Sequence, residues 1–263
     1  MILNSLVPSI STYSADIDFL IDVITLLVGV PFLIACSVFF SFLFRFKKQE
    51  GVPSLYITGN QHRHMKWIHR AHVPVLVFDV IIIVLAVNVW YDIKQDLPEA
   101  NSTVRVIAQQ WAWTFQHPGL DDVFDTADDI RTVNELHIAK DTLYHFKLSS
   151  LDVIHSFSVP VFRLKQDAIP ERVITGWFEA TQTGEHDIQC AEICGIGHGL
   201  MPARIIIETP GQHATWLAAN NPLTMASSSR PESRPESRPE SRPDSQPESE
   251  QEVSPRTQQL AAR

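Results

Sequence analysis

Two long apolar runs constrain this chain more than any other feature of its sequence. One run spans residues 19–46 and the other spans residues 71–91. Each is long enough to cross a hydrocarbon layer of about 30 Å as a helix, because a helix rises about 1.5 Å per residue. We therefore predict an N-terminal two-helix transmembrane hairpin, whose helices are connected by residues 47–70.

The charges beside these runs predict the orientation of the hairpin. Basic residues gather at the end of the first run and between the two runs: Arg45, Lys47, Lys48, Arg63, Lys66 and Arg70. Acidic residues flank the outer ends: Asp16, Asp18, Asp22, Asp92, Asp96 and Glu99. The positive-inside rule places the connecting loop in the cytoplasm. Residues 1–18, everything after Tyr91 and both termini would then lie on the periplasmic side of a bacterial-type plasma membrane.

The first apolar run differs from a cleaved signal peptide. No Lys or Arg precedes it, and its apolar core is too long. The letters "LIAC", which end at Cys36, faintly resemble a lipoprotein cleavage site, but apolar residues continue after them. Two interpretations of Cys36 stay open, lipidation and a small apolar residue within a helix, and the second is favoured.

The rest of the chain divides into a domain and a tail. Residues 92–225 contain short segments rich in β-branched and aromatic residues, without an amphipathic helix of useful length. This pattern predicts a small antiparallel β-sandwich or barrel. Residues 226–263 contain a Ser-Arg-Pro-Glu repeat, in which the prolines prevent a regular helix and nothing apolar can be buried. We predict a disordered tail, and favour a plain spacer over a partner contact.

Charge and cysteine content narrow the possible functions. The formal net charge of −9 argues against nucleic acid as a partner. Three cysteines are too few for a disulfide scaffold. Residues 101–225 carry 15 acidic and 8 basic residues, which would steer a basic surface of a partner. The aspartates between Asp121 and Asp129 could contribute to that surface or form a solvated loop; calcium binding is weaker, because the loop lacks an EF-hand glycine.

The stretch "CAEICGIGHGLM", from Cys190 to Met201, concentrates possible metal ligands. Thiolate, thioether and imidazole groups together suit copper. A mononuclear blue-copper site uses one Cys, two His and a weak axial Met. His198 fits that loop, and His155 in "DVIHSFSVP" fits an upstream ligand. The second cysteine, Cys194, is additional, and two thiolates on one loop could bridge two coppers that each have one terminal His.

Simpler interpretations of the same residues stay open. Cys190 and Cys194 could form a disulfide, or the cluster could hold structural zinc. Zinc does not favour a thioether ligand, so Met201 argues against it. His186 is a further candidate ligand, although a surface histidine is favoured. The combination of two Cys, two His and one Met favours copper over these alternatives.

The motifs "QCAEICGIGHGLMP" and "DVIHSF" resemble the binuclear copper (CuA) motifs of the cytochrome c oxidase subunit II family. The segments "QQWAWTF" and "LKQDAIP" are also similar to segments of that family, although Ala112 stands where the family often has Tyr. The resemblance covers roughly residues 19–210. It implies that the domain at residues 92–225 is an all-β cupredoxin-like sandwich, a Greek-key β-barrel.

The resemblance also implies roles for individual residues. Six residues would hold the two coppers, the two cysteines as bridges and Glu192 through its backbone carbonyl: His155, Cys190, Glu192, Cys194, His198 and Met201. The Glu192 carboxylate would bind a magnesium ion shared with subunit I. Trp111 matches the aromatic residue at which electrons arrive from cytochrome c.

The function that this resemblance implies is that of an electron-transfer component of an enzyme. Subunit II of a cytochrome c oxidase accepts electrons from cytochrome c and passes them to haem in subunit I, which reduces oxygen to water. The expected partners are subunit I, the other oxidase subunits, the membrane and a separate cytochrome c, because this sequence has no Cys-x-x-Cys-His motif for covalent haem.

Other function classes remain as alternatives. A membrane-anchored copper-delivery protein of the thioredoxin type would need one anchor and βαβ patterning. A quinol-oxidase subunit would lack the copper ligands, and a nitrous oxide reductase would need a large catalytic domain. The two apolar runs and the complete ligand set favour the oxidase subunit.

Overall fold

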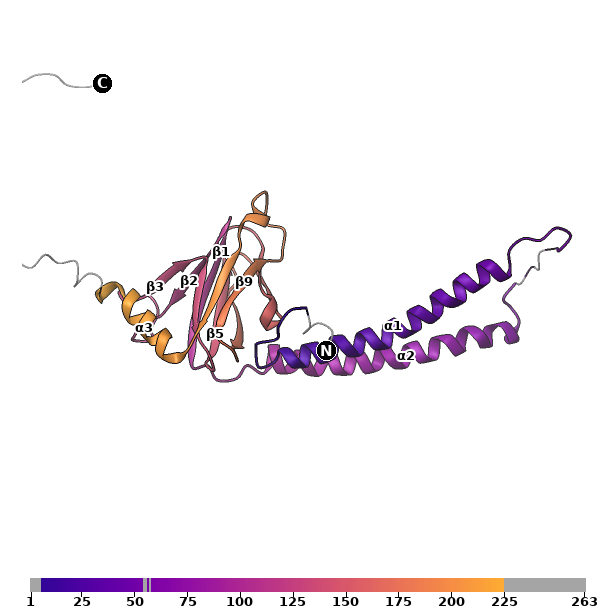
Figure 1. Cartoon of the computed structure of the whole chain (residues 1–263), viewed down its shortest axis with the longest axis horizontal. Coiled ribbons are helices and arrows are strands. Elements are labelled where there is room, and N and C mark those ends of the chain that lie inside the picture. Colours follow the sequence, from indigo (N-terminus) through magenta and orange to yellow (C-terminus); the bar gives the residue numbers. More distant parts are fainter. Residues whose placement is uncertain (1–5, 54–55, 57, 225–263) are drawn as a thin grey trace, which may run out of the picture. The chain divides into compact units, whose positions relative to one another are not determined.

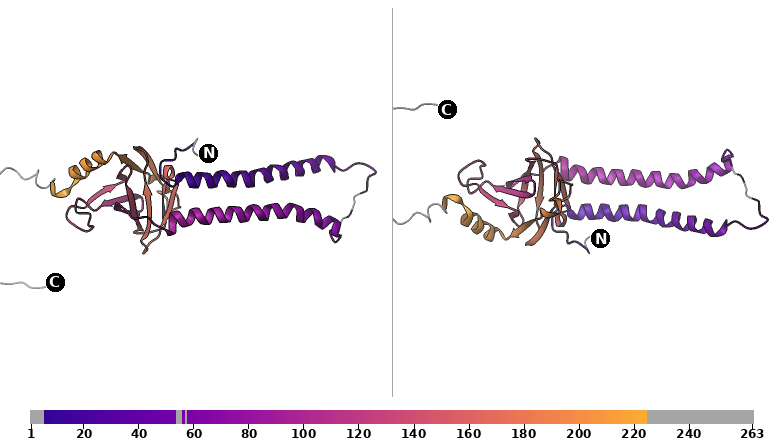
Figure 2. Two further views of the ribbon diagram at one scale, coloured as in Figure 1. Left: turned by 90° about the horizontal axis from the view of Figure 1, so that it is seen from below. Right: turned by 90° about the horizontal axis from the view of Figure 1, so that it is seen from above.

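The computed structural model describes residues 6–53, 56 and 58–224. Two long helices come first, α1 (Ser14–Arg45) and α2 (His62–Trp90), and α2 continues into a turn of π-helix at Tyr91–Gln95. They run side by side in opposite directions (Figures 1 and 2). Both are long and apolar enough to cross a membrane. The predicted two-helix hairpin is therefore present.

Both helices begin earlier in the chain than the apolar runs do. α1 starts at Ser14 rather than at residue 19, and α2 starts at His62 rather than at residue 71. A hydrophobic run marks only the part of a helix that suits a hydrocarbon layer, so the polar turns at its ends escape notice. Each helix also contains one proline, Pro31 or Pro74, which membrane helices tolerate.

Within the described residues, ten strands form two five-stranded sheets that face each other. The first sheet has the order β3-β2-β1-β5-β8, comprising β3 (Ile130–Val133), β2 (Ala112–His117), β1 (Ser102–Gln109), β5 (Leu143–Ser150) and β8 (Ile174–Glu179). The second has the order β4-β10-β9-β6-β7, comprising β4 (Glu135–Ala139), β10 (Ala203–Glu208), β9 (Gly184–Cys190), β6 (His155–Val159) and β7 (Leu164–Ala168). The predicted β-sandwich is confirmed.

Alternating side chains of both sheets fill the space between them. Along β5, Tyr144, Phe146 and Leu148 point inward and are buried. Phe157 of β6 packs against Phe146 and Trp113 from the opposite sheet, with ring centroids 5.9 and 5.5 Å apart. Strand residues alternate between faces, so each strand contributes every second residue to this core.

The sequence had led us to expect purely antiparallel sheets, but two of the strand pairs are parallel. β1 pairs in parallel with β5, and β4 pairs in parallel with β10. The other pairs are antiparallel. The expectation was wrong because inward and outward residues alternate in the same way in both kinds of sheet, so the pattern does not encode strand direction.

The expectation that this domain has no helix of useful length was also wrong. α3 (Pro210–Asn220) follows β10 and packs against β4 and β10. Its start is encoded locally, because Thr209 and Gln212 form a capping box and Pro210 occupies the first turn. The segment "TPGQ" therefore predicts the start of a helix, which an analysis of apolar periodicity alone does not detect.

The segment before α1 packs into the sandwich. Ile10 is buried, and its backbone bonds with Val161 and Thr181 at 3.0 and 2.8 Å. Asp18, in α1, accepts hydrogen bonds from the Arg163 guanidinium at 2.7 and 3.1 Å. These contacts attach the beginning of the hairpin to the domain. The predicted disordered tail at residues 226–263 lies outside the described residues.

Candidate metal centre

The pairing of β6 with β9 brings two of the predicted ligands together. Phe157 of β6 lies opposite Cys190, the last residue of β9, in an antiparallel register. His155 begins β6, so its ring lies close to the end of β9. The loop that follows Cys190 then returns to β10, and this return places Met201 in the core at 1% exposure.

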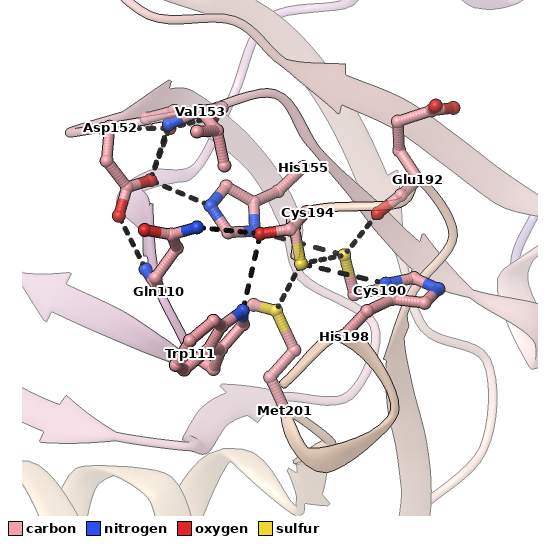
Figure 3. A network of polar contacts seen from close by, with 11 residues as sticks. Gln110, Trp111, Asp152, Val153, His155, Cys190, Glu192, Cys194, His198 and Met201 are labelled. Carbon is pink, nitrogen blue, oxygen red and sulfur yellow. Dashed lines mark hydrogen bonds and ion pairs between the residues drawn. The ribbon is translucent and has the colours of Figure 1, made fainter. Parts of the chain in front are cut away.

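All of the predicted side-chain ligands meet around the two sulfurs, as Figure 3 shows. The Sγ atoms of Cys190 and Cys194 are 3.8 Å apart. His155 Nδ1 lies 3.9 Å from Cys190 Sγ, and His198 Nδ1 lies 3.6 Å from Cys194 Sγ. Met201 Sδ is 3.3 Å from Cys194 Sγ. Each thiol therefore has its own imidazole, and the pair of thiols lies between the two rings.

The two cysteines are free thiols rather than a disulfide. Their separation of 3.8 Å is far beyond a disulfide bond length of about 2.05 Å. Burial, followed by the neighbouring Cys190 thiol, raises the pKa of the Cys194 thiol to about 11. The raised pKa keeps the Cys194 thiol protonated at neutral pH, so a metal ion must displace this proton to bind the thiolate.

His155 has a second partner that the sequence interpretation missed. Its Nε2 lies 2.9 Å from Asp152 Oδ1, and the ring is completely buried. Desolvation opposes ionisation of Asp152, but hydrogen bonds from His155, Gln110 and Val153 lower its pKa. The carboxylate therefore holds the imidazole with Nδ1 turned toward the sulfurs. The signal was an Asp three residues before the His, which is common enough to be overlooked.

Trp111 lies against the cysteine loop, whereas Trp113 is buried in the core of the sandwich. Trp111 is 37% exposed, and its Nε1 donates to the Cys194 carbonyl at 3.3 Å. Its ring covers Gly197 so closely that an added Cβ would lie 2.3 Å from it. Trp113 is fully buried and donates to the Met201 carbonyl at 3.2 Å. Trp113 is thus the core aromatic, and Trp111 is the one that reaches the surface.

Glu192 presents its backbone and its side chain in different directions. Its carbonyl oxygen accepts a contact from Cys190 Sγ at 3.3 Å. The carboxylate is exposed and points away from the sulfurs (Figure 3). The carbonyl can therefore join the sulfur cluster, while the carboxylate is free for a different partner.

The remaining candidate ligands lie elsewhere. In the part of the chain that the structure describes, the one group of three close ligand atoms is that of His155, Cys190 and Cys194. The aspartates after Asp121 serve the loop itself: Asp128 accepts from Leu120 N at 2.8 Å, and Asp129 accepts from Asp125 N at 2.8 Å.

The domain that contains this cluster is similar to known proteins. The family described as "Cytochrome C oxidase subunit II, periplasmic domain" matches residues 102–209. Residues 102–209 are therefore similar to the periplasmic domain of cytochrome c oxidase subunit II. These residues include both sheets and all six predicted copper ligands.

Relatives extend this similarity over different shares of the chain. A probable cytochrome c oxidase subunit 2 of Rickettsia bellii is 32% identical over 157 residues, which are 54% of this chain and 58% of the relative. The cytochrome c oxidase subunit 2 of Cereibacter sphaeroides is 28% identical over 241 residues, which are 80% of this chain and 78% of the relative. The chain therefore spans between about half and about three quarters of the length of these subunit 2 relatives.

A solved structure is also similar. The periplasmic domain of subunit II of cytochrome oxidase from Bradyrhizobium japonicum is 27% identical, with a TM-score of 0.43. The match covers 48% of this chain and 96% of that one.

Proposed function

We propose that this chain is the electron-accepting subunit of a cytochrome c oxidase and holds a binuclear CuA centre. The observation that carries the proposal is the pair of free thiols 3.8 Å apart on one loop, each with an imidazole nitrogen within 4 Å. Thiolate, imidazole and thioether donors fit copper, and Met201 argues against zinc. Bound copper would accept and release single electrons there.

The protein's part is to hold the ligands still. The thiolates of Cys190 and Cys194 would hold the coppers together with His155, His198, Met201 and the Glu192 carbonyl. His155, Cys194 and Met201 are buried at 3% exposure or less. Because side chains in a packed interior resist displacement, these three ligands would keep their positions when the copper is oxidised or reduced.

Two surface residues beside the ligands are suited to the donor and to the acceptor of the electron. Trp111 is partly exposed and bonded to the Cys194 carbonyl, so it is suited to face a separate cytochrome c. The exposed Glu192 carboxylate is suited to a magnesium ion shared with subunit I, because Mg²⁺ prefers oxygen ligands. The haem of subunit I, where oxygen would be reduced, is then the acceptor.

The hairpin supports a two-pass arrangement in a bacterial plasma membrane. The packing of Ile10 into the sandwich supports an N-terminus on the same side as the copper domain. The basic connecting loop supports a cytoplasmic position for the turn. A thioredoxin-type copper-delivery protein has less support, because the described residues form a two-sheet sandwich rather than βαβ units.

The experiment is a spectrum of the full chain in detergent, loaded with copper. We expect an absorption and electron paramagnetic resonance signature of a mixed-valence copper pair, with two coppers per chain. Cys190→Ser and Cys194→Ser should each abolish it, because bridging needs both thiolates. Cys36→Ser, in α1, is the matched control and should leave it unchanged. Two coppers with an unaltered spectrum in either bridging variant would refute the proposal.

A further inference from the structure

Asp79 is a carboxylate in the part of α2 that is apolar enough to cross a membrane. That stretch is Ile68–Gln95, and Asp79 lies eleven residues from its beginning, which is roughly 16 Å along a helix axis. The side chain is exposed, and within the described residues it makes no hydrogen bond or ion pair. An unpaired carboxylate at this depth is costly, so it normally faces a protein neighbour or a polar cavity.

The described residues around Asp79 in the hairpin provide no hydrogen-bond donor to its carboxylate. It lines a groove of about 1160 Å³ between α1 and α2, whose other walls include Leu27, Pro31, Pro74 and Phe78. His72 lies two turns away on α2, and its Nδ1 contacts the Ile68 carbonyl at 2.8 Å. The hairpin alone therefore leaves an apolar groove with one carboxylate in its wall.

We infer that this groove is the docking site for a transmembrane helix of a partner subunit, which places a hydrogen-bond-donating side chain against Asp79. A lipid chain fits an apolar groove but has no donor, and lipid headgroups lie at the ends of the span, about 15 Å away. Ala35 and Ala71 line the same groove, and small residues let a helix approach closely. The inference rests on the proposed function, which supplies the membrane and the partner.

The experiment compares full-length variants in the oxidase complex, purified in detergent through a tag on this chain. The readouts are haem per chain, which reports the partner subunit, the resonance signal of the copper pair, which reports this chain, and bound phospholipid. Asp79→Leu should lower the haem recovered by about three- to tenfold, the usual range for losing one interhelical hydrogen bond. Asp79→Asn should retain most of it, because the amide keeps the size and the acceptor oxygen.

The controls separate docking from misfolding. Asp92→Leu removes a carboxylate just beyond the end of α2 and should leave the haem unchanged. The resonance signal of the copper pair, per chain, should be equal in all variants, because the copper domain is not altered. If Asp79→Leu retains wild-type haem, the inference is wrong, and if it loses only phospholipid, a lipid occupies the groove instead. A wild-type chain that recovers no haem would refute the proposed function as well.

Discussion

Glu192 offers two different oxygens to two different surroundings. The peptide carbonyl faces Cys190 Sγ, while the carboxylate is turned away into solvent. Replacement by Gln preserves the backbone and the size but removes the charge. We expect Glu192→Gln to keep both coppers with a near-normal spectrum, and to weaken magnesium or manganese at the contact with subunit I. Metal analysis and manganese resonance of the assembled complex measure both.

Each contrary result for Glu192→Gln has its own meaning. Full manganese occupancy would show that the carboxylate is not a ligand of that ion. A loss of copper would show that the side chain maintains the shape of the loop, which its exposure does not suggest.

At the scale of residues, the sequence revealed the ligands but not their supports. Two Cys, two His and a Met within short spacings are unusual enough to predict a copper site. Asp152 and Gln110 are ordinary polar residues far from the loop in sequence, yet they bond to His155 and to the Cys194 carbonyl. Gln110 lies 84 positions from Cys194 and 42 from Asp152, so no local pattern records its bonds. Asp152 lies only three residues before His155, but that spacing is too common to mark a support.

At the scale of elements, α3 is attached to the sandwich through a cluster of titratable and aromatic side chains. The members face one another from five elements: His117 of β2, His137 of β4, Tyr144 of β5, Glu208 of β10, and His213 and Trp216 of α3. Trp216 stacks on His137 at 4.1 Å, and Glu208 lies 3.4 Å from His137 and 3.1 Å from His213. His117 Nε2 is buried without a partner.

This cluster predicts that acid weakens the domain. Burial, and then the charges of His213 and His137, lower the pKa of His117 to about 3. An unfolded histidine titrates near pH 6.5, so below that pH the unfolded chain binds a proton that folded His117 does not take up until about pH 3. The free energy of unfolding therefore decreases as the pH falls from about 6.5 to about 3. The share of His117 is about 2 kcal/mol at pH 5.

Denaturant unfolding of the full chain at pH 8 and at pH 5, with Trp fluorescence as the readout, measures this effect. His117→Phe removes the titrating group and sacrifices no bond of Nε2. Its free energy of unfolding, relative to the wild type, should be higher at pH 5 than at pH 8 by about 2 kcal/mol. Equal differences at the two pH values would mean that folding does not lower the pKa of His117.

Some strands could be predicted from the sequence pattern and others could not. β5 contains most of "TLYHFKL", a short segment rich in aromatic and apolar residues, in which every second residue is buried. β9 has one buried residue, Ile188, and β7 is polar between Leu164 and Ala168. Such strands are fixed by hydrogen bonds to neighbours rather than by their own apolar pattern, so the sequence did not reveal them.

At the scale of the whole molecule, the excess of negative charge predicts how a donor arrives. Residues 101–225 carry 15 acidic and 8 basic residues. In the loop beside Arg105, that arginine neutralises Asp125 through two bonds, of 2.7 and 2.9 Å, whereas Asp122 remains exposed. A basic cytochrome c would be attracted over distances comparable to the screening length, which is about 8 Å at 0.15 M salt and about 30 Å at 0.01 M. Raising the salt should therefore slow association.

Stopped-flow mixing of the copper-loaded chain with reduced cytochrome c tests this expectation. The second-order rate should fall by roughly tenfold or more between about 0.01 and 0.15 M salt, because steering acts on the association rate. Reduction by a small neutral reagent is the control and should hardly change with salt. Asp122→Asn should flatten the dependence slightly if the acidic loop takes part. A rate that is independent of salt would mean that the donor docks through apolar contacts around Trp111, and that the acidic surface serves only solvation.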